Sequence, residues 1–398
     1  MLKKTASLLT FMVVFCITFT GCYDKKEIDE LAYVMAIGFD KGNSNSLKLT
    51  FQCAIIQSKG GGGGSSDNEQ SKNKKPPPDT VSVESSDIYT GLSMAGNALG
   101  KQLNLSHAQA LVFSEEIARS GAMQKYIHSM IRNREFRPNM FVIVAKGNAE
   151  DYINSVDPKS SSSTAKYYEL KYTTYNYSGY TTNTSLYRFY NELESYAVEP
   201  VATFVDASPK NSDEPDSQST KPIGLAAFGD AKMVGEIPEQ QVAYYLLTNG
   251  YLRSVSVPIP DPKQKGEYVV LNLSKARNPK ATVTIDGGKP KINLKLRLEA
   301  DFVSIESGEE YERKGLTELF EQSAEGYLRD ETLKFLNYTA KDLKSDVCGF
   351  GKHAKWMFST WDEWRNSNWQ KLYSDSDFDV TVDLKVRRPG LLIRTQTP

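Results

Sequence analysis

The N-terminal segment most constrains how this chain can fold, because it differs in kind from everything that follows it. It begins with the basic residues Lys3 and Lys4, and residues 5–23 then carry no charge and are largely apolar. Small residues stand directly before Cys22. A basic start, an apolar core and small residues at a cleavage point are typical of a secretory signal peptide. We therefore predict that residues 1–21 are removed and that the folded body begins at Cys22.

An uncleaved transmembrane helix is the alternative, since this uncharged stretch is close to the ~20 residues that span a bilayer. Its several hydroxyl side chains weaken it as a membrane span. A cysteine directly after Thr20-Gly21 instead resembles the signal of a bacterial lipoprotein, in which Cys22 would carry a thioether-linked diacylglycerol. Two acyl chains, at about 0.8 kcal/mol per buried methylene, anchor a protein stably. We therefore expect Cys22 to be the lipidation site, with the body on the outer face of the cytoplasmic membrane.

Charge and residue counts exclude several classes of protein. Lys and Arg total 48 against 49 Asp and Glu, and loss of Lys3 and Lys4 with the signal changes the formal charge from −1 to −3. Because phosphate-binding domains normally carry a basic excess, no nucleic-acid partner is expected. The four Cys and three His are scattered without CxxC or HExxH spacing. We therefore expect no metal site, no disulfide framework and no cofactor other than the covalent lipid on Cys22.

Length and hydrophobic patterning predict an α+β protein of two or three domains, with mixed sheets and packed helices. The predicted N-terminal α/β domain covers residues 22–205 and contains a flexible Gly/Pro-rich loop at 58–79. A polar segment at 206–221 has the composition of a linker. Beyond it we expect a middle β-rich domain at 222–285 and a C-terminal α+β domain at 286–398.

Individual elements follow from the same patterns. In the first domain we expect strands at 31–39, 47–55, 108–113 and 140–145, and helices at 87–103 and from Ser114 to about Arg132. In the remainder we expect a hairpin at 223–234, a helix at 238–247, strands at 253–257, 267–273, 291–302 and 378–387, and helices at 310–344 and 352–371.

All four tryptophans lie close together near the C-terminus: Trp356, Trp361, Trp364 and Trp369. Large rings on a helix that covers a half-buried sheet are usually core, whereas a cluster of exposed rings indicates a partner surface or a lipid headgroup contact. The spacing does not fit one narrow helical face, so at least one ring should lie near the surface. The tyrosine-rich segment 158–183 has the same two interpretations, a recognition surface or a loop clamped to the domain by its rings.

Catalytic residues are not indicated. No GxSxG motif occurs, and Cys348 with His353 is a local pair without a third group to orient it. Cys53 lies on the apolar face of an alternating strand, where a cysteine usually acts as a small buried hydrophobe. The sequence therefore predicts a protein without catalytic residues.

Four segments together resemble the Ger(x)C family, the lipoprotein C subunits of bacterial spore germinant receptors. They are GCYDKKEI running into LAYVMAIGFDKG from residue 21, residues 105–153 (LSHAQALVF to NAEDYI), IGLAAFGDAKMVGEI at 223–237, and the run from SDVCGFGKHAKWMF through WDEWRNSNWQKLY to VTVDLKVRRPG. The resemblance implies a three-domain α+β lipoprotein on the outer face of the spore inner membrane. It implies as partners a polytopic A subunit, which resembles amino-acid transporters, and a polytopic B subunit. Only Cys22 carries over as a functional position.

The leading functional prediction is thus a non-enzymatic, lipid-anchored subunit of a nutrient germinant receptor, needed for spore germination. One alternative is a solute-binding lipoprotein of a transporter, which requires a cleft between two similar α/β lobes. A second is a cell-wall-active enzyme whose tryptophans stack on sugars, which requires two carboxylates within about 5–10 Å of each other in one cleft.

Overall fold

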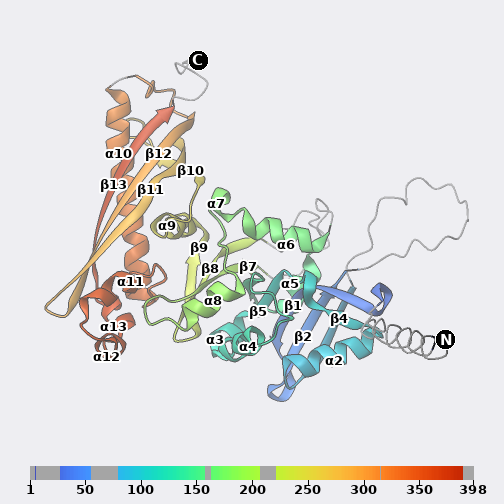
Figure 1. Cartoon of the computed structure of the whole chain (residues 1–398). Helices are drawn as coiled ribbons and strands as arrows, with labels where there is room; N and C mark the ends of the chain where they lie inside the picture. Colours follow the sequence, from blue (N-terminus) through green and yellow to red (C-terminus); the bar gives the residue numbers. More distant parts are fainter. Residues whose placement is uncertain are drawn as a thin grey trace, which may run out of the picture.

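The computed structural model describes Thr5 and residues 27–54, 79–156, 163–206, 221–313 and 315–388 (Figure 1). The predicted signal peptide with Cys22, the predicted loop apart from Asp79, and the predicted linker apart from its two end residues lie outside these ranges.

A nine-stranded mixed sheet forms the first part of the molecule, with strand order β3-β2-β1-β5-β6-β7-β8-β9 and β4 paired to β1. The strands β1, β5, β6 and β7 run parallel, β4 is parallel to β1, and β2, β3, β8 and β9 pair antiparallel with their neighbours. The bounds are β1 Leu31–Lys41, β2 Leu47–Cys53, β3 Asp79–Ser85, β4 Gln102–Asn104, β5 Ala110–Ser114, β6 Phe141–Lys146, β7 Val201–Asp206, β8 Pro222–Gly229 and β9 Lys232–Pro238.

Helices cover both faces of the parallel strands, which explains why these strands are continuous apolar runs in the sequence. One face packs on α2, α3, α4 and α8 around Phe39, Phe113 and Phe204, and the other packs on α5 and α6 around Tyr152 and Tyr168. The bounds are α2 Ile88–Leu99, α3 Glu115–Ser120, α4 Ala122–Ile131, α5 Ala149–Ser155, α6 Thr164–Thr173, α7 Tyr175–Ser178 and α8 Leu186–Leu193.

Local capping decides where these helices begin and end. The Ser114 hydroxyl accepts the backbone N–H of Ile117, as expected of the first helical cap. The predicted single helix to Arg132 is wrong, because Gly121 adopts φ +82° and separates α3 from α4. The predicted helix at 87–103 likewise ends early, at Gly100 in the left-handed conformation.

A second, four-stranded sheet with order β10-β11-β12-β13 forms the other end of the molecule, at the left of Figure 1. Its strands β12 and β13 are parallel, and the other pairs are antiparallel. Alternate residues of β12 are buried, as the period-2 pattern predicts for a sheet with one wet face. The bounds are β10 Ser254–Pro260, β11 Tyr268–Asp286, β12 Lys289–Ile305, β13 Asp377–Arg388, α9 Glu239–Thr248 and α10 Leu316–Asn337.

The predicted domain division after the linker is wrong in two respects. The proposed boundary between residues 285 and 286 falls inside β11, which forms one long hairpin with β12 through Gly287-Gly288. The linker joins β7 to β8, which pair antiparallel in the same sheet. Polar composition marks where a chain is solvated between two strands, and it does not show whether those strands pair.

The predicted helix at 352–371 is broken into short pieces: α11 Gly351–Ala354, the 3₁₀ turn η6 Lys355–Met357, α12 Trp361–Asn366 and α13 Trp369–Ser374. Thr360 starts a new helix with a capping box to Glu363, and Asn368, at φ +49°, interrupts the chain before α13. The predicted helix at 310–344 is confirmed in its central part as α10, which continues into a π-helical turn, η5 Tyr338–Asp342.

Candidate functional site

Both interpretations of the tryptophan cluster hold, each for two of the rings. Trp364 and Trp369 are buried, with ring centroids 6.0 Å apart. Trp356 is 81% exposed and Trp361 is 62% exposed. The rings stand on three short elements, η6, α12 and α13, so one helical wheel cannot describe them. The structure therefore places two tryptophans in the core and two on the surface.

A buried carboxylate organises the core half of this cluster. Asp346 accepts hydrogen bonds from the Trp369 indole N–H at 2.8 Å, the Gly351 N–H at 2.8 Å and the Phe350 N–H at 3.1 Å. Burial raises the pKa of Asp346, and these donors act in the opposite direction. At Gly351 an added Cβ would lie 2.7 Å from the Trp369 ring. Sequence reasoning missed Asp346, although it stands in the SDVCGFG motif.

The surface half of the cluster forms what we call the aromatic patch: Tyr196, Trp356, Met357 and Trp361, all exposed. Tyr196 meets Trp361 edge-on, with centroids 6.1 Å apart. Lys355 Nζ lies 4.8 Å from the centroid of Trp356, and the Arg365 guanidinium lies 5.9 Å from that of Tyr196. The patch is thus an exposed aromatic surface edged by basic side chains.

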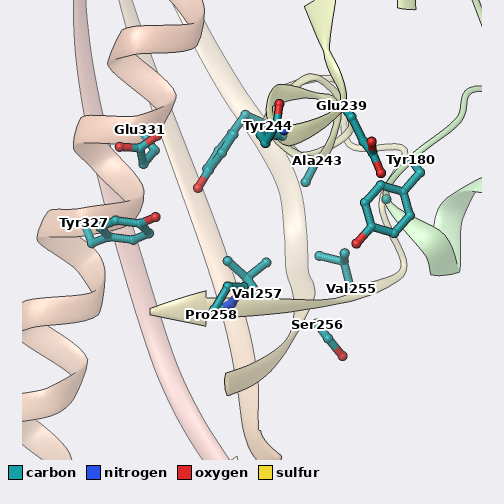
Figure 2. Close-up of a pocket in the computed structure, with 12 residues that line it drawn as sticks. Tyr180, Glu239, Ala243, Tyr244, Val255, Ser256, Val257, Pro258, Tyr327 and Glu331 are labelled. Carbon is teal, nitrogen blue, oxygen red and sulfur yellow. The ribbon is translucent and has the colours of Figure 1, made fainter. Parts of the chain in front are cut away.

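A cavity of about 410 Å³ lies where α9, α10 and β10 meet the turn after α7 (Figure 2). Its walls are apolar at Val255 and Val257. They are polar at three tyrosines and two carboxylates, drawn in Figure 2: Tyr180, Tyr244, Tyr327, Glu239 and Glu331. Both carboxylates already have cationic partners, since Lys221 lies 3.1 Å from Glu239 and Lys334 lies 2.5 Å from Glu331. Burial raises the pKa of the Tyr244 hydroxyl. The cavity has room for a small ligand, but its acids are paired.

A second hollow, of about 530 Å³, lies beside the aromatic patch between the end of α8, the β8–β9 turn and α12–α13. Glu199 lines it and is only 8% exposed. Burial is the main cause that raises the pKa of Glu199 to about 8, and the nearby acids Asp230 and Asp346 add to it. This carboxyl group therefore holds its proton at neutral pH.

The cysteines of the described residues are poor nucleophiles. Burial raises the pKa of Cys53 to about 12 and that of Cys348 well above its ordinary value. Since a thiolate is the reactive form, neither thiol is activated. His353 lies exposed on α11, and its pKa is lowered by partial burial and by Lys352. Cys53 lies in the core, as predicted.

The tyrosine-rich segment is clamped to its domain. Tyr168 donates a hydrogen bond to the Gln52 side chain at 3.2 Å, and the hydroxyls of Tyr152 and Tyr172 lie 3.0 Å apart, all four residues being buried. Tyr177 and Tyr180 are exposed at its end. The clamp interpretation is confirmed for the buried rings of α6.

Membrane-spanning helices and metal sites are two features that the described residues allow us to compare with the predictions. Within those ranges, no helix is both long and apolar enough to cross a bilayer. Nor does any group of three or more His, Cys, Asp or Glu there have an arrangement that could hold a metal ion. Cys22, the predicted lipidation site, lies outside the described ranges.

Two family models match the chain in succession. The model of the spore germination protein N-terminal domain matches residues 24–207. The model of the spore germination B3/GerAC-like C-terminal domain matches residues 223–390. The short gap between the two matches falls on the predicted linker, and the first match begins just after Cys22.

Curated relatives match over nearly their whole length. Spore germination protein B3 of Bacillus subtilis is 20% identical over 389 residues, covering 96% of this chain and 98% of the relative. Spore germination protein KC of the same species is 24% identical over 402 residues, covering 96% of both chains. Among solved structures, the crystal structure of the GerBC protein aligns with a TM-score of 0.55 at 17% identity, over 88% of this chain and 96% of that one. This likeness shows a shared fold.

Proposed function

The chain belongs to the GerAC-type family of spore germination proteins, and on that premise we propose that it is the non-enzymatic, lipid-anchored C subunit of a nutrient germinant receptor. The observation that carries this proposal is the end-to-end match: two family models in order over the body, preceded by the Thr-Gly-Cys junction at Cys22. Relatives named as germination proteins match across the same length.

The proposed mechanism is binding rather than chemistry. A lipid on Cys22 would hold the body at the bilayer, where it would dock on polytopic A and B subunits. A docked subunit changes their response only if its contacts differ between their resting and responsive states. The buried thiols and the lysine-paired carboxylates of the Figure 2 cavity support a role without catalysis.

The two alternative functions fit the geometry less well. A solute-binding lipoprotein needs two similar α/β lobes, whereas this chain joins a helix-covered, partly parallel sheet to a four-stranded sheet packed on α10. A cell-wall enzyme needs a free acid pair beside its sugar-stacking rings. Glu199, with its raised pKa, and Asp230 line one hollow, but the tryptophans that line it, Trp364 and Trp369, are buried and present no ring face to a sugar.

The anchoring part is tested by Cys22→Ser in the spore-forming host. We expect the protein to leave the membrane fraction and the response to nutrient germinant to fall at least about tenfold, because two acyl chains supply nearly all membrane affinity in this proposal. The measurements are fractionation of spore membranes and the rate of germination. Cys16→Ser, which lies within the predicted signal peptide, is the matched control. A membrane-bound Cys22→Ser protein would contradict the anchor.

The docking part is tested separately by co-purification of the wild-type protein from detergent-solubilised spore membranes. We expect two polytopic subunits to accompany it in fixed ratio. Recovery of the protein alone, with its lipid attached, would contradict the receptor assignment and leave the anchor intact.

A further inference from the structure

Two tryptophans of this protein are exposed to water in a way that folded monomers seldom show. Trp356 and Trp361 are 81% and 62% exposed, Met357 and Tyr196 are exposed as well, and the Tyr196 and Trp361 rings meet. Contiguous exposed apolar surface marks an interaction site more often than it occurs by chance. Trp364 and Trp369, a few residues away, are buried in the core. Two of the four tryptophan rings therefore pack in the core, and the other two lie on the surface.

The exposed rings are held in place by ordered structure. The Glu363 carboxylate accepts the backbone N–H groups of Ser359 and Thr360, and the Thr360 hydroxyl accepts the Glu363 N–H. Behind this cap, the buried Trp364 ring packs against Phe358 with centroids 5.4 Å apart. A capped helix on a packed base fixes the direction of Trp361. The aromatic patch is therefore presented to solvent by a rigid support.

The charges around the patch favour one kind of partner. Lys355 lies over Trp356, Arg365 lies over Tyr196, and Lys352 is exposed nearby. Asp362 and Glu363 are exposed on the same helix as Arg365, and the Glu363 carboxylate also caps it, so the three basic side chains exceed these two acids by one. Tryptophan, tyrosine, methionine and arginine are enriched in protein–protein interfaces, but lysine is depleted there. Tryptophan and tyrosine beside lysine and arginine are typical of the headgroup layer of a bilayer. Basic side chains there gain about 1 kcal/mol each from anionic lipid.

We propose that the aromatic patch inserts into the headgroup layer of a bilayer that contains anionic phospholipid. The rings of Trp356 and Trp361 enter the interface, and Lys355 and Arg365 contact lipid phosphates. The helix α12, which carries Trp361 of the patch, lies at one end of the molecule, and β1 begins beside β4 at the other end (Figure 1). The contact is therefore separate from any lipid at Cys22, and it would hold the far end of the body at the membrane.

The test uses the chain from residue 22 onward carrying Cys22→Ser, so that no acyl chain contributes. Its binding to vesicles is measured by co-sedimentation, and insertion by the blue shift of tryptophan emission. The probes are vesicles of phosphatidylcholine with phosphatidylglycerol and vesicles of phosphatidylcholine alone. We expect binding to the mixed vesicles, weaker binding to the neutral ones, and loss of affinity as salt is added.

Variants assign the binding to the patch. Trp356→Ala with Trp361→Ala should lower the affinity for mixed vesicles about tenfold, because two rings that would be partly buried in the bilayer interface are removed. Lys355→Gln with Arg365→Gln should remove most of the preference for anionic lipid. Tyr187→Ala with Tyr268→Ala, which removes two exposed rings elsewhere, is the matched control and should bind as the parent does. Unchanged circular dichroism and melting temperature establish that each variant is folded.

Two outcomes would overturn this proposal. The first is a parent chain that binds neither kind of vesicle, which would assign the patch to a protein partner. The second is a tryptophan double variant that binds as tightly as the parent. Because the chain is not acylated, failure here leaves the anchoring proposal for Cys22 standing.

Discussion

At the scale of single residues, burial sets the chemistry of two acids that lie close to each other between β7 and the C-terminal helices. Asp346 is held by three N–H donors and supports Trp369. Glu199 donates its backbone N–H to the Asp346 carbonyl oxygen at 3.0 Å, and its carboxyl group is raised in pKa to about 8. These two acids stand on opposite sides of the linker in sequence, so their meeting couples the two family-model halves.

The raised pKa of Glu199 predicts how stability depends on pH. The folded protein keeps this proton up to about pH 8, whereas an unfolded chain loses it near the ordinary value of 4.5. Between these values the folded state binds more protons, so the free energy of unfolding should fall as pH rises through that window. Glu199→Gln cannot titrate and should remove roughly 2–4 kcal/mol of this dependence.

Urea denaturation of the wild type and of Glu199→Gln at pH 5, 6, 7 and about 8.5 measures this difference. Because Asp346 is one of the charges that raise the pKa of Glu199, the difference reports the titration of Glu199 together with its coupling to Asp346. Stability curves that run parallel across this range would show that Glu199 is ionised in the folded protein.

At the scale of elements, α10 completes the smaller sheet by covering its edge strand. The Glu321 side chain accepts the Val386 N–H at 2.8 Å, and the Glu325 side chain accepts the Leu384 N–H at 2.8 Å. Glu321 also pairs with Lys385 at 2.7 Å. An open edge strand pairs readily with strands of other chains. Its N–H groups cannot do so while they are bonded to these carboxylates. The side chains of α10 thus accept N–H groups of β13 that a fifth strand would otherwise bond.

The edge contact predicts the effect of removing both carboxylates. Glu321→Ala with Glu325→Ala leaves two N–H groups of β13 without these acceptors, which should lower the free energy of unfolding by about 2–4 kcal/mol. It should also raise aggregation, because the edge of β13 becomes free to pair. Urea denaturation and light scattering measure the two effects. Glu331→Ala, on the same helix but away from this edge, should change stability by less than about 1 kcal/mol. Equal effects of the two variants would contradict the edge-capping role.

At the scale of the whole molecule, the linker separates two family models but not two folding units. The strands β8 and β9 follow the linker and complete the sheet that β1 to β7 begin. The core on that side includes Val201 before the linker and Leu225 and Ile237 after it. If the chain were divided at the linker and the two products separated, each product would therefore expose an apolar sheet edge.

This continuity predicts that residues 22–207 carrying Cys22→Ser do not fold into a stable monomer alone. The unpaired edge of β7 should cause aggregation, and co-expression with residues 221–398 should restore a soluble complex. Size-exclusion chromatography and circular dichroism of the fragment, with and without its complement, check the prediction. A soluble, cooperatively melting 22–207 monomer would show that the family models are also independent domains.

Several strands and the helix start at Ser114 were predictable from sequence because their causes are local, whereas β3, β7 and α6 were not among the predicted elements. Period-2 alternation marks β2 and β12, and the cap at Ser114 lies within three residues of the N–H it binds. The predicted signal peptide and the proposed lipidation of Cys22 likewise rest on sequence alone, since a modification signal is read from contiguous residues.

Tertiary structure decided the features that depend on residues far apart in the chain. Pairing of β7 with β8 across the linker, the parallel joining of β13 to β12, and the division of the tryptophans into core and surface have no local signature. The pKa of Glu199 depends on its burial and on Asp230 and Asp346, which only the packing brings beside it. Sequence patterns reveal the conformational preference of short segments. Burial and the proximity of charges depend on which segments pack together.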